Sequence, residues 1–403
     1  MDKFIKECSW HNLIAFFLAA SLFTLPLSST AKSICVALAL GSIVLSPGYL
    51  HTLCAVLKKT WCQATLILFF IALIACCWSP ATASEKYFVF EKYSKLIYLP
   101  TFVIGFQDCR IRRLGLHAFL LAMTITALLS ILKFHNLLNF EIINSDHVFR
   151  NHIMTSFMMA FSAYLAGLFF YRQRGIAKIV YASLYLLFSY QVLFVNFGRT
   201  GYAIYLILIN LLLIQLLPKR QAIAGLIAVA VLFSCCYHLS SPMQVGIQNV
   251  IGDWQHYKED KNTSVGYRFQ FHDFAEKLFK NHVILGNGTG SYTYLYRVDK
   301  PIPERDREVL EPHSQYWLVL AEFGILGLTG LLFFFGSLWV AATRLNDMKP
   351  IAIAILLSFC IGSFSDSLIF YSGSGYLFIL LMALCLGEEL GLGSRPQQLK
   401  MTL

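Results

Sequence analysis

Three polar side chains stand where they could act on a phosphorylated substrate. Arg199 lies in a short turn between two apolar segments, Arg268 opens an amphipathic stretch, and His313 directly follows Pro312. A guanidinium stays charged at any physiological pH, and its planar fork of donors fits phosphate oxygens. A neutral imidazole can take a proton from a hydroxyl group. These residue types therefore favour a phosphate clamp and a general base.

Each of the three side chains also has an ordinary structural interpretation, and the residues alone leave it open. An arginine at a membrane interface often anchors lipid phosphate, and an arginine on a helix face is often only solvated. For His313, we expect a place in or near the first turn of a helix that Pro312 starts. The positive end of that helix would favour neutral imidazole, whereas nearby Glu311 would oppose it.

The composition is that of a membrane protein. Of the 403 residues 57% are apolar and only 13% are charged, which is far less charge than soluble domains carry. The net charge of +10 comes from short basic clusters between apolar runs, so it argues for membrane topology and against nucleic-acid binding. The eleven cysteines show no CxxC spacing, and we interpret them as small apolar residues of membrane helices.

Hydropathy predicts an all-α, polytopic membrane protein with about twelve transmembrane helices. A helix needs roughly 20 apolar residues to cross a bilayer, and somewhat fewer when its ends snorkel. The segments expected to span are 13–27, 31–45, 64–78, 96–106, 114–132, 153–171, 179–197, 202–217, 222–239, 316–340, 351–370 and 376–386. The fourth and the last of these are short.

One large polar segment interrupts this pattern and divides the chain into three parts. Helices 1 to 9 are expected in 1–239, the polar insert in 240–315, and helices 10 to 12 with a cytoplasmic tail in 316–403. Lysines and arginines concentrate on one side, so we expect both termini on the cytoplasmic side and the insert on the outer side of the membrane. Within the insert, apolar spacing predicts an amphipathic helix over 265–281, which the glycine-rich run 286–290 ends.

Three further features of the sequence are weaker signals of function. The glycine run follows no strand, so it does not indicate a nucleotide site. His272 and Glu276 share a helix face, but without a third ligand they favour a surface pair over a metal site. Glu322 and Asp366 fall inside apolar runs, where an ionisable group is costly; they either brace the helix bundle or line the path of an acceptor.

The spacing around His313 resembles a family signature. His313 and Ser314 are followed by nine residues, then Gly324, two residues and Gly327, which matches the pattern of the bacterial O-antigen ligase (WaaL) family. That family lies within a wider group that includes the O-antigen polymerases. The stretches 198–201, 265–268 and 361–366 are also similar to family segments. The resemblance covers the second half of the chain, whereas the first half agrees only in hydropathy.

The resemblance implies a glycosyltransferase of GT-C-like architecture that needs no metal and no cofactor. The donor would be O-antigen carried on undecaprenyl diphosphate, the acceptor a sugar hydroxyl of the lipid A core, and the outcome inversion at the anomeric carbon. Carried over to this sequence, Arg199 and Arg268 would contact the donor diphosphate and His313 would be the base. Arg150 would assist in binding the donor or else anchor the membrane surface.

Three other functions stay open at the level of sequence. An O-antigen polymerase shares the architecture but uses a second lipid-linked glycan as acceptor, and a protein O-oligosaccharyltransferase uses a protein. A transporter or flippase of lipid-linked sugars would also explain twelve helices. A transporter predicts broken helices or paired membrane charges in two similar halves, and the sequence shows neither.

Overall fold

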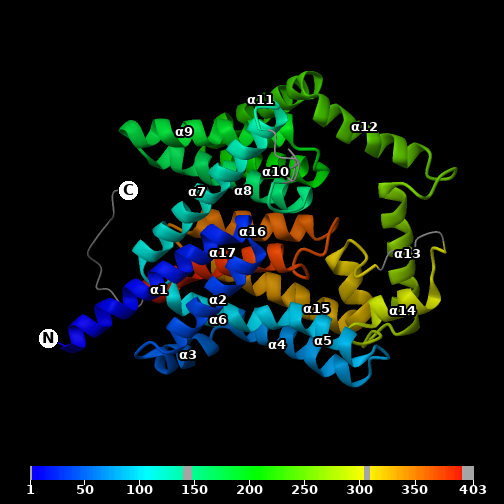
Figure 1. Cartoon of the computed structure of the whole chain (residues 1–403), viewed down its shortest axis with the longest axis horizontal. Coiled ribbons are helices and arrows are strands. Elements are labelled where there is room, and N and C mark those ends of the chain that lie inside the picture. The colour runs from blue at the N-terminus through cyan, green and yellow to red at the C-terminus, as the bar shows by residue number, and fades with distance from the viewer. Residues whose placement is uncertain (1, 139–147, 304–308, 393–403) are drawn as a thin grey trace.

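The computed structural model describes residues 2–138, 148–303 and 309–392, and every regular element in these ranges is helical (Figure 1). Most are α-helices, η1 and η2 are 3₁₀ turns, and η3 is a π-helical turn. In chain order they are α1 (Asp2–Leu27), α2 (Ser29–Val44), α3 (Tyr49–Leu57), α4 (Thr60–Ile74), η1 (Ala75–Cys77), α5 (Ala83–Ser94), η2 (Lys95–Ile97), α6 (Tyr98–Gly105), α7 (Cys109–Phe134), α8 (His152–Arg172), α9 (Gly175–Tyr190), η3 (Gln191–Val195), α10 (Arg199–Leu216), α11 (Lys219–Leu239), α12 (Ser241–Gln255), α13 (Ser264–Asn281), α14 (Ser291–Asp299), α15 (Gln315–Thr343), α16 (Lys349–Gly362) and α17 (Ser372–Leu392).

Each of the twelve segments expected to span a membrane contains a helix, but not every helix has the length of a membrane span. Nine helices of the described residues have the length and composition to cross, and the pair α2 and α3, bent by 100°, makes ten if it counts as one span. The remaining two are α6, which has eight residues, and α16, which has 14. The expected count of about twelve stays a prediction. In the described residues α6 is short, and α16 ends at Gly362, where the apolar residues after it form a turn.

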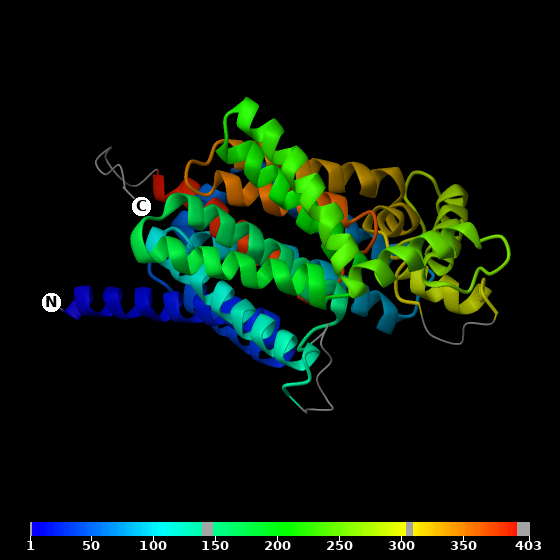
Figure 2. The ribbon, with the colours of Figure 1, turned by 90° about the horizontal axis from the view of Figure 1, so that it is seen from above.

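The long helices run roughly along one axis, and the insert gathers at one end of the bundle (Figures 1 and 2). The beginning of α1 and the end of α17 lie at the opposite end, which agrees with the expectation that the two termini share a side. Most of α8 and α17 is buried, whereas α11 is almost fully exposed along its length. Residues 393–403, the predicted cytoplasmic tail, lie outside the described residues.

The insert is a set of three helices, α12 to α14, and α13 is the predicted amphipathic helix. Its apolar residues Phe271, Phe274 and Leu278 are buried, and the helix packs along α15. Thr263 caps the start, since its side-chain oxygen accepts a hydrogen bond from the Gly266 amide at 3.1 Å. The helix thus joins the insert to the membrane bundle.

A break in α15 receives the glycine-rich loop of the insert. Gly324 has φ +62°, outside the helical region, which frees backbone groups on both sides of it. The loop uses them: the Ile325 amide donates to the Val283 carbonyl at 2.9 Å, and the Gly288 amide donates to the Glu322 carbonyl at 2.8 Å. A Cβ on Gly324 would lie 2.5 Å from a backbone oxygen of the loop. Only glycine allows this close approach at that φ.

Candidate active site

Arg199 is the first residue of α10, and the glycines around it allow that helix to start close to α8. The Gly198 amide donates to Oδ1 of buried Asn196 at 2.6 Å, which fixes the turn before the helix. A Cβ on Gly201 would lie 2.3 Å from the Cβ of Ser156 in α8. The close packing holds Arg199 at the insert end of the bundle.

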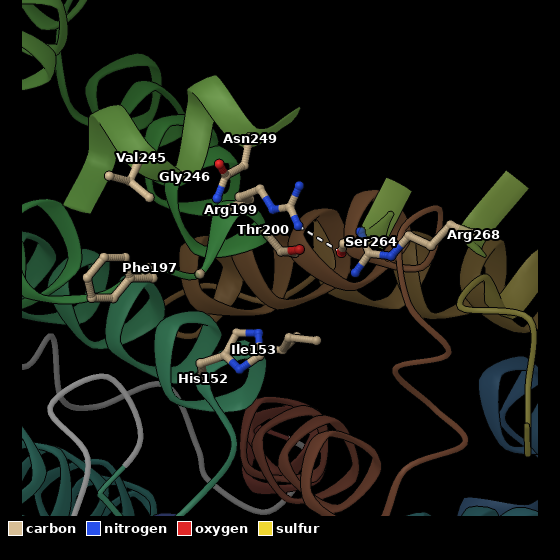
Figure 3. Close-up of a pocket in the computed structure, with 11 residues that line it drawn as sticks. His152, Ile153, Phe197, Arg199, Thr200, Val245, Gly246, Asn249, Ser264 and Arg268 are labelled. Atoms are coloured by element: carbon tan, nitrogen blue, oxygen red, sulfur yellow. Dashed lines mark hydrogen bonds between the residues drawn. The ribbon is translucent and has the colours of Figure 1, made fainter. Parts of the chain in front are cut away.

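Arg199 and Arg268 line the same pocket, of about 250 Å³, which we call the arginine pocket. Figure 3 shows both guanidinium groups directed toward Ser264, whose hydroxyl accepts a hydrogen bond from Nη2 of Arg199 at 2.8 Å. Asp253 lies 3.8 Å from Nη1 of Arg199, a weak ion pair. The full lining is His152, Ile153, Phe197, Gly198, Arg199, Thr200, Val245, Gly246, Asn249, Ser264 and Arg268.

The charge of this pocket suits an anion. Arg268 makes no ion pair with a carboxylate in the described part of the chain, and Asp253 is the single acid that pairs with Arg199 there. Two guanidinium groups facing one small cavity repel each other, so a bound anion with several oxygens would relieve the repulsion.

His313 lies near the first turn of α15, as expected, but it precedes the helix, and Pro312 does not start it. The helix begins at Gln315, where Ser314 is the cap: its side-chain oxygen lies 3.5 Å from the amide of Trp317. A serine oxygen can satisfy a free amide at a helix start, which Pro312 cannot do. His313 itself has φ +54°, a left-handed conformation that a helix cannot continue.

This backbone turn directs the His313 ring toward two buried carboxylates. Nδ1 lies 3.0 Å from Oε1 of Glu311, an ion-pair distance, and 3.3 Å from Oδ1 of Asp366, with which it forms a hydrogen bond. The Glu311 side chain is 1% exposed and that of Asp366 4%, whereas His313 is 30% exposed. Of the three groups, the histidine is the one that a substrate can reach.

Glu311 is held by three donors besides the His313 ring. Tyr371 donates its hydroxyl to Oε1 at 2.7 Å, Ser367 donates its hydroxyl to Oε2, and the amide of His313 donates to Oε2 at 2.6 Å. Ser367 and Tyr371 lie in the turn between α16 and α17, as does Asp366. Burial nevertheless raises the pKa of Glu311, since a carboxylate loses hydration there.

The two carboxylates also set the charge preference of His313. Burial opposes the charged imidazolium, but the hydrogen bond to Asp366 and the charge of Glu311 outweigh it, so the pKa of His313 lies above its usual value. Of the opposing influences expected from the sequence, the charge of Glu311 prevails over the helix start, and Asp366 adds to it. A proton on Nδ1, held by these oxygens, leaves Nε2 as the atom that can accept one from a substrate.

The three residues singled out in the sequence meet through α13. Arg268 lines the arginine pocket, and its charge also acts on His313, lowering the pKa of that imidazole against the carboxylates. Phe271, three residues later on the same helix, stacks on the His313 ring with centroids 5.9 Å apart. A positive pocket and a carboxylate-bound histidine therefore lie side by side.

Arg150 lies outside the lining of that pocket. Its guanidinium donates to the carbonyl oxygen of Leu25, from Nη2 at 2.7 Å and from Nε at 3.1 Å, and it also binds the Ser29 hydroxyl. It therefore caps the end of α1, where carbonyl groups lack partners within the helix. These contacts give no support to a role at the donor diphosphate.

Residue types and spacing did not reveal the carboxylate partners of His313. Glu311 was noted only as a charge near the histidine, and Asp366, which lies 53 residues later, only as an acid in an apolar run. The signal that points to Asp366 is its position in an apolar run, because burying a carboxylate there is unfavourable unless a partner stabilises it. Glu322, the other such acid, accepts from the Tyr292 amide at 3.4 Å and so ties α15 to α14.

The same cluster has the donor set of a metal site. One atom each from Glu311, His313 and Asp366 lies within 4.8 Å of the others. Both oxygens of Glu311 already accept hydrogen bonds, and Nδ1 faces the carboxylates as a donor, so hydrogen bonding accounts for the arrangement without an ion. At the surface pair weighed in the sequence, Glu276 instead binds Lys280 at 2.7 Å.

One family comparison covers most of the residues of this site. Residues 184–332 match the family model described as O-Antigen ligase. This stretch is an O-antigen ligase family domain. It contains Arg199, Arg268, Glu311 and His313, whereas Asp366 follows it. No match was found among curated proteins. With its membrane-length helices, the O-antigen ligase domain identifies a membrane enzyme of the O-antigen ligase or polymerase type.

Proposed function

We propose that the protein is an O-antigen ligase of the bacterial inner membrane. It transfers a glycan from undecaprenyl diphosphate to a sugar hydroxyl of the lipid A core on the periplasmic face, with inversion and without a metal ion. The observation that carries this proposal is the placement of the arginine pocket beside His313, joined by α13. The family match supports the same chemistry.

Arg199 and Arg268 take the donor in this proposal. When the bond between the anomeric carbon and the phosphate oxygen breaks, its electron pair stays with the diphosphate, where negative charge builds up. Two guanidinium groups fixed around one cavity stabilise that charge more as the bond breaks than before, which lowers the barrier. The carrier lipid remains in the membrane while the diphosphate lies in the pocket.

His313 serves the acceptor. The acceptor oxygen forms a bond to the anomeric carbon while its proton passes to Nε2 of His313. Asp366 and Glu311 hold the Nδ1 side of the ring and stabilise the imidazolium that forms, in the way a buried acid supports a catalytic histidine. Attack opposite to the leaving diphosphate inverts the anomeric centre.

Purified protein, radiolabelled lipid-linked O-antigen and core lipid, mixed without added metal, test the proposal. Label on the core lipid supports ligation and excludes a transporter. Label only in longer lipid-linked glycan would instead show a polymerase, and label on an added periplasmic protein would show protein glycosylation. A deletion strain gives the same decision in cells: loss of a ligase leaves long polymer on the carrier, whereas loss of a polymerase leaves core with one repeat unit.

A further inference from the structure

Two buried lysines converge on the start of α17 with no carboxylate to neutralise them. Nζ of Lys32, from α2, donates to the Ser372 hydroxyl at 2.7 Å and lies 4.1 Å from the centre of the Tyr376 ring. Nζ of Lys95, in η2, donates to the carbonyl oxygens of Phe370 and Tyr371, both at 3.0 Å. Each lysine is only 2% exposed. In the described part of the chain neither forms an ion pair.

More positive charge surrounds this pair. The charges of Lys92 and Lys32 both act on Lys95, and that of Arg150 acts on Lys32. The acid that faces them is Glu91, an exposed side chain 3.6 Å from Lys92. We call Lys32, Lys92, Lys95 and Arg150 the basic cluster. Burial and the neighbouring cations lower the pKa of Lys95, because no paired counter-charge in the described residues stabilises its ammonium form; a bound anion would supply that counter-charge.

Both lysine side chains have N–H groups that these hydrogen bonds do not use. A lysine carries three N–H groups, and the hydrogen bonds above use one on Lys32 and two on Lys95. Burying charged donors without acceptors is costly, so such groups are normally paired. Ser372, the partner of Lys32, is exposed, so an oxyanion arriving from solvent first meets the hydroxyl to which the buried Lys32 ammonium donates.

A single residue, Tyr371, connects the basic cluster to the carboxylate that holds His313. Tyr371 accepts the Lys95 hydrogen bond with its carbonyl oxygen and donates its hydroxyl to Glu311, the partner of His313. The arginine pocket reaches His313 by a different route, through Arg268 on α13. The histidine is therefore connected to two separate groups of cations.

We infer that the basic cluster binds a phosphate group of the acceptor glycolipid, with Lys32 and Lys95 as its principal donors. The inference rests on the proposed function, which assigns the arginine pocket to the donor diphosphate. An acceptor phosphate at Ser372 would lie next to Tyr371, whose hydroxyl contacts Glu311, the partner of His313, so the acceptor would be held on the side of the proposed base. Each substrate then has its own set of cations, and the two anions do not compete.

The lysines could instead have a purely structural role as ties between α2, η2 and α17, and substitutions that remove their charge distinguish the two roles. Lys32→Gln and Lys95→Gln keep a hydrogen-bond donor but remove the charge, and Lys86→Gln in α5 is the matched control. If the cluster binds phosphate, each of the two variants raises KM for phosphorylated core lipid by about tenfold or more, as expected for a lost charged hydrogen bond. KM for the lipid-linked donor stays at its wild-type value.

The acceptor chemistry separates the outcomes. With enzymatically dephosphorylated core lipid, wild type and both variants are expected to share one high KM. An equal loss on both acceptors, or a loss in donor KM, overturns the inference in favour of a structural role. Binding of phosphorylated core lipid and of phosphatidylglycerol vesicles to the detergent-purified protein is a second measurement, which does not require catalytic activity. Equal, lysine-dependent binding of both would assign the site to membrane phospholipid and overturn the acceptor role.

The proposed function and this inference fail separately. If wild type transfers no glycan to core lipid, the proposed function is wrong, yet lysine-dependent binding of phosphorylated core lipid is still measurable. If transfer occurs but the binding and KM of Lys32→Gln and Lys95→Gln equal those of wild type, only the inference is wrong. Thermal unfolding of each variant in detergent identifies a loss that comes from misfolding.

Discussion

Nδ1 of His313 and Oδ1 of Asp366 are 3.3 Å apart although 53 residues separate them in the chain. The contact requires the turn between α16 and α17 to reach the segment before α15. A catalytic role of His313 therefore depends on a buried carboxylate that lies outside the stretch matched by the family model.

Removing either pocket arginine should reduce transfer. We expect Arg199→Ala and Arg268→Ala each to lower kcat/KM by about 100- to 1,000-fold, the range for loss of a donor that stabilises transition-state charge. Arg199→Lys should recover part of the rate, since an ammonium keeps the charge but not the fork. Glycan transfer with purified enzymes is the measurement. Arg297→Ala in α14, whose arginine pairs with Glu85 at 3.0 Å, is the control; wild-type rates in both pocket variants would refute the donor site.

The pH dependence of transfer should report the raised pKa of His313. A base acts when neutral, so the rate should rise with pH through a pKa above that of an ordinary histidine. Asp366→Asn removes a hydrogen bond and a charge that raise this pKa, so the rising limb should move to lower pH while the maximal rate falls. His313→Ala should cost about 100- to 10,000-fold and abolish the limb. An unchanged profile in Asp366→Asn would show that another group titrates.

The raised pKa of His313 also makes the stability of the fold depend on pH, in the direction opposite to the transfer rate. Its folded-state pKa is raised, so the protonated histidine adds stability below the unfolded pKa, and this contribution is lost as the pH rises through the folded value. The enzyme should therefore gain rate while it loses this part of its stability. Thermal unfolding of wild type and His313→Ala in detergent at several pH values measures the effect; a difference that does not vary with pH would contradict it.

Substitution at the break in α15 should destabilise the protein. Gly324→Ala forces φ +62° on a residue with a Cβ and places that Cβ 2.5 Å from a loop oxygen, which costs about 1–3 kcal/mol for the conformation alone. Gly336→Ala is the control in the same helix, because its Cβ would meet nothing within 4 Å. The unfolding temperature in detergent should fall only in the first variant. Equal temperatures would mean that the loop does not depend on the break.

Chelation should leave the activity unchanged if hydrogen bonds alone organise the cluster of Glu311, His313 and Asp366. We expect transfer by the purified enzyme to be the same with and without EDTA, and no stimulation by Mg²⁺ or Zn²⁺. Both oxygens of Glu311 are already occupied by hydrogen-bond donors, which is the physical reason. A reproducible loss with EDTA, restored by one divalent ion, would make these residues metal ligands.

Hydropathy located the helices well because a bilayer demands long apolar stretches, and each of the twelve expected segments contains a helix. It did not locate the ends of these helices, since an apolar run does not show where backbone turns interrupt it. The run 351–370 is an example: α16 ends at Gly362, and the following turn carries Asp366. The amphipathic helix over 265–281 was predictable because its apolar face repeats at helical spacing.

The site was predictable only in part. Residue type singled out Arg199, Arg268 and His313, and their shared location follows from the packing of α13. The partners Glu311 and Asp366 and the left-handed backbone of His313 depend on contacts distant in sequence, which no local pattern encodes. The break at Gly324 was also hidden, because a glycine inside an apolar run is compatible with an unbroken helix.

The glycine-rich loop is held in the break of α15 by hydrogen bonds between backbone atoms. The contact therefore tolerates changes in many neighbouring side chains, but it requires the loop and the break to be present together. Chimaeras that exchange acceptor preference between relatives should therefore move residues 283–288 and 321–326 as one cassette. A chimaera with its junction between these two segments would pair the loop of one protein with the helix break of another and lose their fit, even where every membrane helix is preserved.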